Sequence, residues 1–242
     1  MKWNLMDDAP TESWRGVMTQ MLRASMCVGA SGGVLQMLFG NAAAENMLDL
    51  FHSLYCTSVS LRVVVHAGRD KDGELEANAD DTRLMGEMLC NSMAYFCVDA
   101  CYIASELLRG RHVHMWQGRI VHHLLQAVCN VTTSAPHIKK KQVVRRYTAQ
   151  AYLAEGSQIF MRLHAMRKQS KALYTVAMIS FFCFRVVNAP YAMSLVYRHL
   201  GQRGADDNLT KLHLVGGTTA YLVNLYWFAM LLKKVKKYQL QA

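Results

Sequence analysis

The chain has 242 residues, of which 52% are hydrophobic and only 18% charged, against roughly 25% charged in an average soluble domain. This composition excludes a disordered or low-complexity chain and a disulfide scaffold. The length allows one or two soluble domains, or roughly six to eight membrane helices of about 20 residues each with their loops. The mean hydropathy of +0.05 fits both classes, because the charges are concentrated in loops and ends.

Long runs without Asp, Glu, Lys or Arg favour a membrane protein. They cover residues 24–44, 120–138 and 212–232, and residues 172–197 are interrupted only by Arg185. A helix at the surface of a soluble protein turns a charged face to water, whereas apolar runs of about 18 or more residues are typical of membrane spans. We therefore predict an all-α, polytopic transmembrane helix bundle. A soluble bundle of very apolar helices is the alternative.

Seven helices are predicted in chain order, over residues 17–39, 46–65, 86–108, 118–134, 149–166, 172–198 and 212–233. We expect an N-terminal interfacial segment (residues 1–16), a transmembrane domain (17–237) and a short C-terminal tail (238–242). The acidic N-terminal segment fits neither a secretory signal nor a transit peptide, so its apolar successor is expected to be a retained helix. Basic loops account for the net charge of +10, which favours membrane lipids over nucleic acid as partners.

The seven cysteines all lie in apolar stretches and lack the paired spacing of zinc sites, so no metal site is predicted. They are expected to act as small apolar fillers. In the first helix, Gly29 and Gly33 form a G-x-x-x-G pattern, which permits close helix packing.

Ionisable and amide side chains recur within the predicted helices, several of them three or seven residues apart and therefore on one face. Charged groups at membrane depth are costly and usually face the bundle interior. They predict an internal polar or lipid cavity. The structural alternative is that pairs such as Asp99 and Arg185 hold helices together. The candidate lining residues are Asp49, His52, Asp99, Glu106, Glu155, Arg185, Asn188 and Asn224.

Two adjacent histidines, His122 and His123, lie on the fourth predicted helix. Their side chains point about 100° apart, so one can face a cavity while the other packs. Packing or hydrogen bonding is the ordinary role of such a pair. At membrane depth, a functional role gains weight because an ionisable group is costly there.

Several short motifs recur in order along the chain: residues 46–56 (NMLDLFHSLYC), 95–108 (YFCVDACYIASELL), His122–His123, 155–157 (EGS), 182–190 (FCFRVVNAP) and 224–227 (NLYW). Together they resemble the TLC-domain family, the membrane domain shared by ceramide synthases and several lipid-homeostasis proteins. The resemblance runs from about residue 17 to 237 and implies a barrel of helices around a cavity for a lipid chain, usually in the endoplasmic reticulum.

The ceramide synthase branch implies acyl transfer, with a histidine as general base and two downstream aspartates. Here Glu155 and Gln158 stand at the aspartate positions, so the chain looks more like the non-synthase branch. We therefore expect lipid binding or regulation of membrane lipid composition, without catalysis and without a cofactor.

Two alternatives to this expectation stay open. The first is a ceramide synthase-like lipid N-acyltransferase with acyl-CoA as substrate and His122 or His123 as catalytic base. The second is a structural subunit of an organelle membrane complex, for which the mitochondrial inner membrane replaces the endoplasmic reticulum as the expected location. Assembly into a homo-oligomer or hetero-oligomer is compatible with each of these functions.

Overall fold

A computed structural model of the chain describes residues 14–39, 41–67, 79–110, 116–134, 142–167, 170–203 and 208–239. Most of the predicted segment 1–16, His112 and His114 in the loop after residue 110, the lysines at 139–141 and residues 240–242 lie outside this part. The domain boundaries predicted at both ends of the transmembrane domain stay a prediction.

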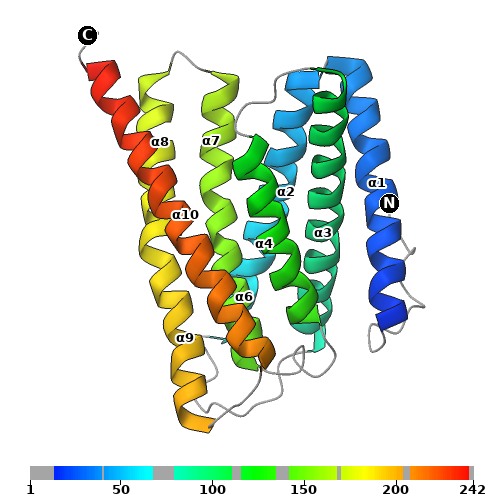
Figure 1. Ribbon diagram of the computed structural model, residues 1–242, viewed down its shortest axis with the longest axis vertical. Helices are drawn as coiled ribbons and strands as arrows, with labels where there is room; N and C mark the ends of the chain where they lie inside the picture. Colours follow the sequence, from blue (N-terminus) through cyan, green and yellow to red (C-terminus); the bar gives the residue numbers. More distant parts are fainter. Residues whose placement is uncertain are drawn as a thin grey trace. The chain divides into compact units, whose positions relative to one another are not determined.

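The described residues are helical throughout and contain no strand, which confirms the predicted all-α bundle. They form seven helical rods, because α6 joins α7 and α8 joins α9 end to end, and each predicted range lies inside one rod. The helices are α1 (Trp14–Phe39), α2 (Asn41–Ala67), α3 (Ala79–Leu108), α4 (Trp116–Ser134), α6 (Gln142–Tyr152), α7 (Gly156–Met166), α8 (Lys171–Phe181), α9 (Asn188–Arg203) and α10 (Asn208–Gln239) (Figure 1).

Three stretches of the described residues are long and apolar enough to cross a membrane. They are Ala43–His66 in α2, Lys171–Tyr197 in the rod of α8 and α9, and Leu214–Val235 in α10. Helix α4 has 19 residues and is close to the required length, but polar side chains along one face lower its hydropathy.

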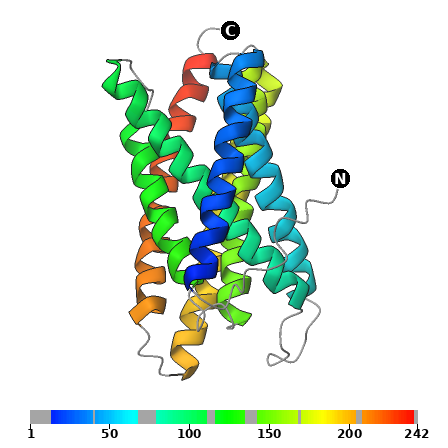
Figure 2. The ribbon, with the colours of Figure 1, turned by 90° about the vertical axis from the view of Figure 1, so that its right-hand side faces the viewer.

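The chain divides into two compact units, of which unit 1 comprises Met1–Ala44 and Glu74–Arg145. Its main described helices are α1, α3 and α4; α1 and α3 run side by side in the same direction, and α4 runs back along α3 (Figure 2). Asp80 and Asp81 in the first turn of α3 stabilise the positive end of its dipole. The helix ends before Gly110, whose φ of 70° is the left-handed conformation that a terminating glycine adopts readily.

The glycines of the G-x-x-x-G pattern are not used for close packing by the described part of unit 1. A Cβ atom added to Gly29 or Gly33 would meet no atom within 4 Å. Helix α1 instead packs on α3 through another face, where Ala24 is buried and the buried Gln20 accepts a weak hydrogen bond from the Cys90 thiol (3.6 Å).

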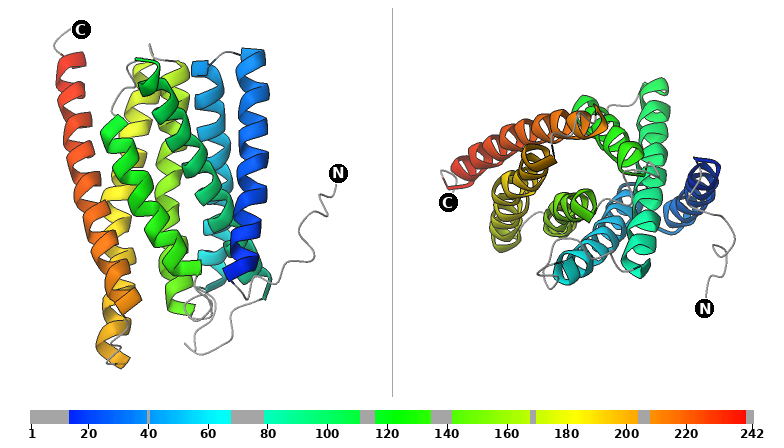
Figure 3. Two further views of the ribbon diagram at one scale, coloured as in Figure 1. Left: turned by 45° about the vertical axis from the view of Figure 1, so that its right-hand side comes forward. Right: turned by 90° about the horizontal axis from the view of Figure 1, so that it is seen from below.

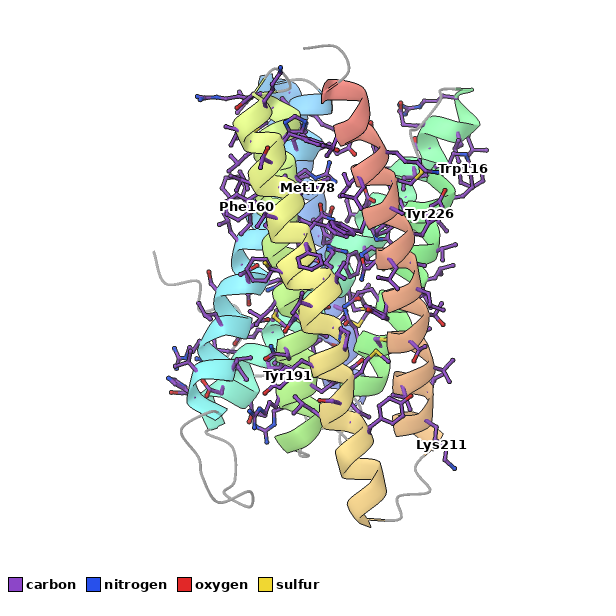
Figure 4. All side chains as sticks on the ribbon, turned by 90° about the vertical axis from the view of Figure 1, so that its left-hand side faces the viewer. Trp116, Phe160, Met178, Tyr191, Lys211 and Tyr226 are labelled. Carbon is purple, nitrogen blue, oxygen red and sulfur yellow. The ribbon has the colours of Figure 1, made fainter. Side chains whose placement is uncertain are left out.

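Unit 2 comprises Glu45–Gly73 and Arg146–Ala242. Its rods follow one another in chain order, from α2 through α7 and the rod of α8 and α9 to α10 (Figure 3). Helices α8 and α10 pack through an apolar cluster of Tyr174, Phe181 and Leu231. Other side chains of α10, such as Tyr226 and Lys211, are exposed (Figure 4).

Two short turns interrupt rods that the sequence predicts as continuous α-helices. A 3₁₀ turn, η1 (Leu153–Glu155), joins α6 to α7, and a π-helical turn, η2 (Phe182–Val187), joins α8 to α9. Pro190 follows η2; it has no N–H for the carbonyl of Val186 and its ring would clash with that carbonyl in a regular helix. The wider π turn accommodates this defect, and such turns often occur at functional sites.

Candidate functional site

Three polar side chains of unit 1 form a buried cluster between α3 and α4. One oxygen of Asp99, Oδ1, accepts a hydrogen bond from Arg119 Nη2 at 2.5 Å, and the other, Oδ2, lies 2.5 Å from His123 Nε2. Asp99 and His123 are both buried, with His123 only 8% exposed. With an ionised Asp99, the proton of the neutral imidazole is placed on Nε2, which donates to the carboxylate.

This assignment leaves the other imidazole nitrogen of His123 as an acceptor. Nδ1 is buried and has no hydrogen-bond partner among the described residues. A buried acceptor without a donor costs roughly 1–3 kcal/mol.

The cluster is electrically neutral when His123 is neutral, because Arg119 compensates Asp99. A neutral cluster costs far less to bury in an apolar bundle than an uncompensated charge. The carboxylate of Asp99 is shared between two donors, Arg119 and His123, and this arrangement fixes the orientation of the imidazole.

Phe96 of α3 packs against both adjacent histidines, whose own ring centroids lie 5.7 Å apart. The ring of Phe96 lies 4.9 Å from the His123 ring and 5.9 Å from the His122 ring, centroid to centroid. His122 is half-buried and His123 is buried against its carboxylate. This matches the divergence that adjacent positions on a helix require.

A second buried cluster lies in unit 2 and is centred on Arg185 in η2. Its Nε donates to Ser157 Oγ (2.8 Å), its Nη1 donates to Asn224 Oδ1 (3.1 Å), and its Nη2 forms an ion pair with Glu155 Oε1 (3.5 Å). The guanidinium also lies 5.3 Å from the centre of the Phe181 ring. The π turn thus places the arginine against η1 and α7 on one side and α10 on the other.

Two further polar contacts connect the rods of unit 2. Asn188 and Gln150 bond reciprocally: the Gln150 side chain donates to Asn188 Oδ1, and Asn188 Nδ2 donates to the Gln150 carbonyl (2.7 Å). On α7, Arg162 pairs with Asp49 of α2 and donates to Asn46 (3.4 Å). In these contacts polar side chains find hydrogen-bond partners within the protein, which the hydrocarbon chains of lipid cannot provide.

The sequence matches the family model of the TLC domain over residues 42–233. The chain belongs to the TLC-domain family. The matched region includes both buried clusters, whereas α1 precedes it. No curated protein and no solved structure matches the chain. The protein is an integral membrane protein of a family with a lipid-related role.

Within the TLC domain, the structure brings some of the predicted site residues together. Asp99 meets His123 in unit 1, and Arg185 meets Glu155 and Asn224 in unit 2. The pair suggested between Asp99 and Arg185 is replaced, because each of these side chains takes other partners. Their roles in catalysis or in lining a cavity stay predictions.

Four other predicted site residues of the TLC domain lie apart from these clusters. Asn188 and Asp49 take the separate partners described above. The buried Glu106 forms an ion pair with Arg109 at the end of α3 (3.4 Å), and His52 lies beside Cys56 on its own helix (3.7 Å). Among the described residues, no group of three or more His, Cys, Asp or Glu side chains is placed to hold a metal ion.

Arg119 is the residue of the unit 1 cluster that is absent from the predicted candidates, although it lies within the predicted helix 118–134. It precedes His123 by four residues, a spacing that puts both on one helical face and could have revealed it. Arg162, which is also absent from the candidates, pairs with Asp49. Gln150 carried no signal beyond a polar residue in an apolar segment.

Proposed function

We propose that this TLC-domain protein binds a membrane lipid through its polar part and regulates membrane lipid composition without catalysis, as a member of the non-synthase branch. The observation that supports the proposal is the buried Nδ1 of His123, a fixed acceptor without a donor from the described residues. In a membrane, the missing donor can come from a hydroxyl or N–H group of a bound lipid.

The neutral charge of the cluster favours binding over chemistry. Arg119 already occupies half of the carboxylate that would stabilise an imidazolium. Lipid binding requires only that His123 Nδ1 is held in place, and Asp99 and Phe96 hold the imidazole ring.

The proposal is tested by photo-crosslinking in lipid nanodiscs with clickable sphingolipid and glycerophospholipid probes that carry a diazirine. We expect labelled peptides from α4, and at least a fivefold loss of labelling in His123→Leu, which removes the acceptor at similar size. Leu124→Met, on the exposed side of the same helix, is the matched control and should label as the wild type does. Equal labelling of His123→Leu and wild type would contradict the proposal.

The N-acyltransferase is kept as the second candidate because one observation favours it. A histidine held by a carboxylate, with its other nitrogen free, is the arrangement that general-base catalysis uses. In that reaction the amine nitrogen of a sphingoid base attacks the acyl-CoA thioester carbon and gives up a proton to Nδ1. The amide C–N bond forms, the C–S bond breaks, and the thiolate of coenzyme A leaves with the proton returned from Nδ1.

The assay for this second candidate incubates purified protein with acyl-CoA and sphingoid base and measures the amide by mass spectrometry. Product that disappears in His123→Ala and in Asp99→Asn would establish the enzyme and reject binding without catalysis. No product above that of empty nanodiscs, together with lipid labelling, would support the first proposal.

For the cellular setting, the family points to the endoplasmic reticulum, with the mitochondrial inner membrane as the alternative. Fractionation of cells that express the tagged protein separates the two. Co-purification with many subunits in mitochondrial fractions would favour the structural-subunit function. Mass photometry of the purified protein then distinguishes a homo-oligomer from a single chain.

A further inference from the structure

Four basic side chains gather at one end of unit 2, where α7 ends, α8 begins and α10 ends (Figure 1). Arg167 is the C-cap of α7, Lys171 is the first residue of α8, and Lys233 and Lys234 lie near the end of α10. All four are exposed. These four side chains are called the basic end of unit 2 below.

Contacts among the three helices place these residues at one level. The Tyr174 hydroxyl of α8 donates to the Leu231 carbonyl of α10 (2.8 Å), and the Tyr174 ring lies 5.1 Å from the His164 ring of α7, centroid to centroid. Lys171 lies three residues before Tyr174, and Lys234 lies three residues after the bonded carbonyl. Because α8 begins and α10 ends here, each lysine lies about 4.5 Å beyond this contact, on the same side of its helix.

This level coincides with the ends of two membrane spans. The span Lys171–Tyr197 begins at the first of these lysines, and the span Leu214–Val235 ends one residue after Lys234. Lysine and arginine side chains at the end of a span extend their charged groups toward the lipid headgroups. The basic end of unit 2 therefore lies at the level of the headgroups of one leaflet.

Acidic side chains do not compensate this charge in the segments that carry it. Residues 156–205 and 208–242 contain no Asp or Glu. The more buried arginines of unit 2, Arg162 and Arg185, each have a carboxylate partner. Within the part of the chain that the structure describes, no residue of the basic end forms an ion pair.

Stabilisation of the helices explains only part of this charge. Cations near the C-terminal ends of α7 and α10 offset the negative end of each helix dipole. Lys171 has the opposite position, directly after the N-cap Ser170, and the first turn of α8 contains no acidic residue. A cation there adds to the positive end of the dipole, which disfavours the helix but attracts an anion.

We propose that the basic end of unit 2 binds the phosphorylated headgroup of an anionic phospholipid, with a preference for a headgroup of more than one negative charge. Each lysine or arginine close to an anionic bilayer strengthens binding by about fivefold. Several cations without a neighbouring acid suit a headgroup of high charge density. The surface is open, so the headgroup needs no cavity and its acyl chains stay in the bilayer. The site is separate from the buried, neutral cluster of His123.

The test is native mass spectrometry of the full chain in detergent micelles. Its probes are phosphatidylinositol 4-phosphate, phosphatidylserine and phosphatidylcholine with the same acyl chains. Wild-type protein should bind the inositol lipid at least tenfold more tightly than phosphatidylcholine, with phosphatidylserine between them. Lys171→Gln combined with Lys234→Gln should lower the affinity for the inositol lipid at least tenfold and leave that for phosphatidylcholine unchanged. Lys234→Gln alone should lower it at least threefold.

The matched control is Lys211→Gln, which removes one exposed charge near the other end of α10 and should bind the inositol lipid within twofold of wild type. Equal affinity of wild-type protein for the three lipids, an unchanged affinity in the double variant, or an equal loss in Lys211→Gln would overturn the proposal. Soluble inositol 1,4-bisphosphate that displaces the lipid at equal concentration would also overturn it, because the surface would then serve a free phosphate compound.

Two further variants keep the test decisive. If the double variant is not recovered, Lys234→Arg is compared with Lys234→Gln: the arginine variant should retain the affinity that the glutamine variant loses, and equal affinities would reject the role of charge. His123→Leu separates this proposal from the one for unit 1, since it should bind the inositol lipid as wild type does. A His123→Leu variant that loses this binding would place the anionic lipid in unit 1 and overturn the proposal.

Discussion

Replacing Glu155 by glutamine removes the counter-ion of Arg185 and leaves the shape of its neighbour almost unchanged. Arg185 is 2% exposed, and among the described residues Glu155 is its only ion-pair partner. Breaking a buried pair from one side costs about 3–5 kcal/mol, because the remaining charge stays buried. For a chain of this size about 1 kcal/mol corresponds to roughly 2–4 °C in Tm. We therefore expect Glu155→Gln to lower Tm by about 6–20 °C.

A double-mutant cycle shows whether the charge is the cause. Arg185→Met together with Glu155→Gln removes both charges, so the double variant should be more stable than Glu155→Gln alone. Glu87→Gln is the matched control. Arg83 Nη1 lies 2.7 Å from Glu87 Oε1, but the Arg83 side chain is 61% exposed, and such surface pairs contribute only about 0–1 kcal/mol. Tryptophan fluorescence during thermal unfolding in nanodiscs is measured for wild type, Glu155→Gln, Arg185→Met, the double variant and the Glu87→Gln control. Simple additivity of the two substitutions, or a Glu155→Gln variant that melts with wild type, would refute the reasoning.

Three smaller changes test the packing of unit 2, each by the same unfolding measurement. Gly217→Ala places a Cβ 2.6 Å from the Tyr147 hydroxyl and should cost about 1–3 kcal/mol of stability. Adding Tyr147→Phe should restore most of that loss, and no recovery would mean that another contact is responsible. Ser170→Ala removes the N-cap of α8 and should cost about 1 kcal/mol of stability, whereas Ser170→Thr should retain most of it. An unchanged Tm in the alanine variant would contradict a stabilising role of the cap. Tyr174→Phe removes the hydrogen bond that the Tyr174 hydroxyl donates to the Leu231 carbonyl (2.8 Å) and should cost about 1 kcal/mol of stability. Amide exchange near residue 231 should become faster, and unaltered exchange there would contradict the role of this bond.

The helices could be predicted because the signal is local. A run without charges as long as residues 212–232 has few alternatives to a buried or membrane helix. The turns η1 and η2 were missed, although Pro190 gives a sequence reason for the second. A proline inside an apolar run is compatible with a kink, a helix end or a π turn, and the choice depends on which neighbouring groups satisfy the freed backbone.

The polar clusters could be predicted only in part, for the same physical reason. Burial at membrane depth singles out Asp99, His123 and Arg185 from sequence alone, because each is costly there. Which partner each one takes depends on helix packing. The pair of Asp49 with Arg162 joins residues more than a hundred positions apart, and neither hydropathy nor spacing within one helix specifies such a contact.

The two clusters solve the same electrostatic problem with different consequences. Each buries an arginine against a carboxylate from a neighbouring segment, so that neither leaves a net charge in the bundle. In unit 2 the acceptors around Arg185 are already engaged by its guanidinium, and the result is a joint between rods. In unit 1 the Nδ1 of His123 is buried and has no hydrogen-bond partner among the described residues, and this atom is the basis on which we propose lipid recognition by unit 1.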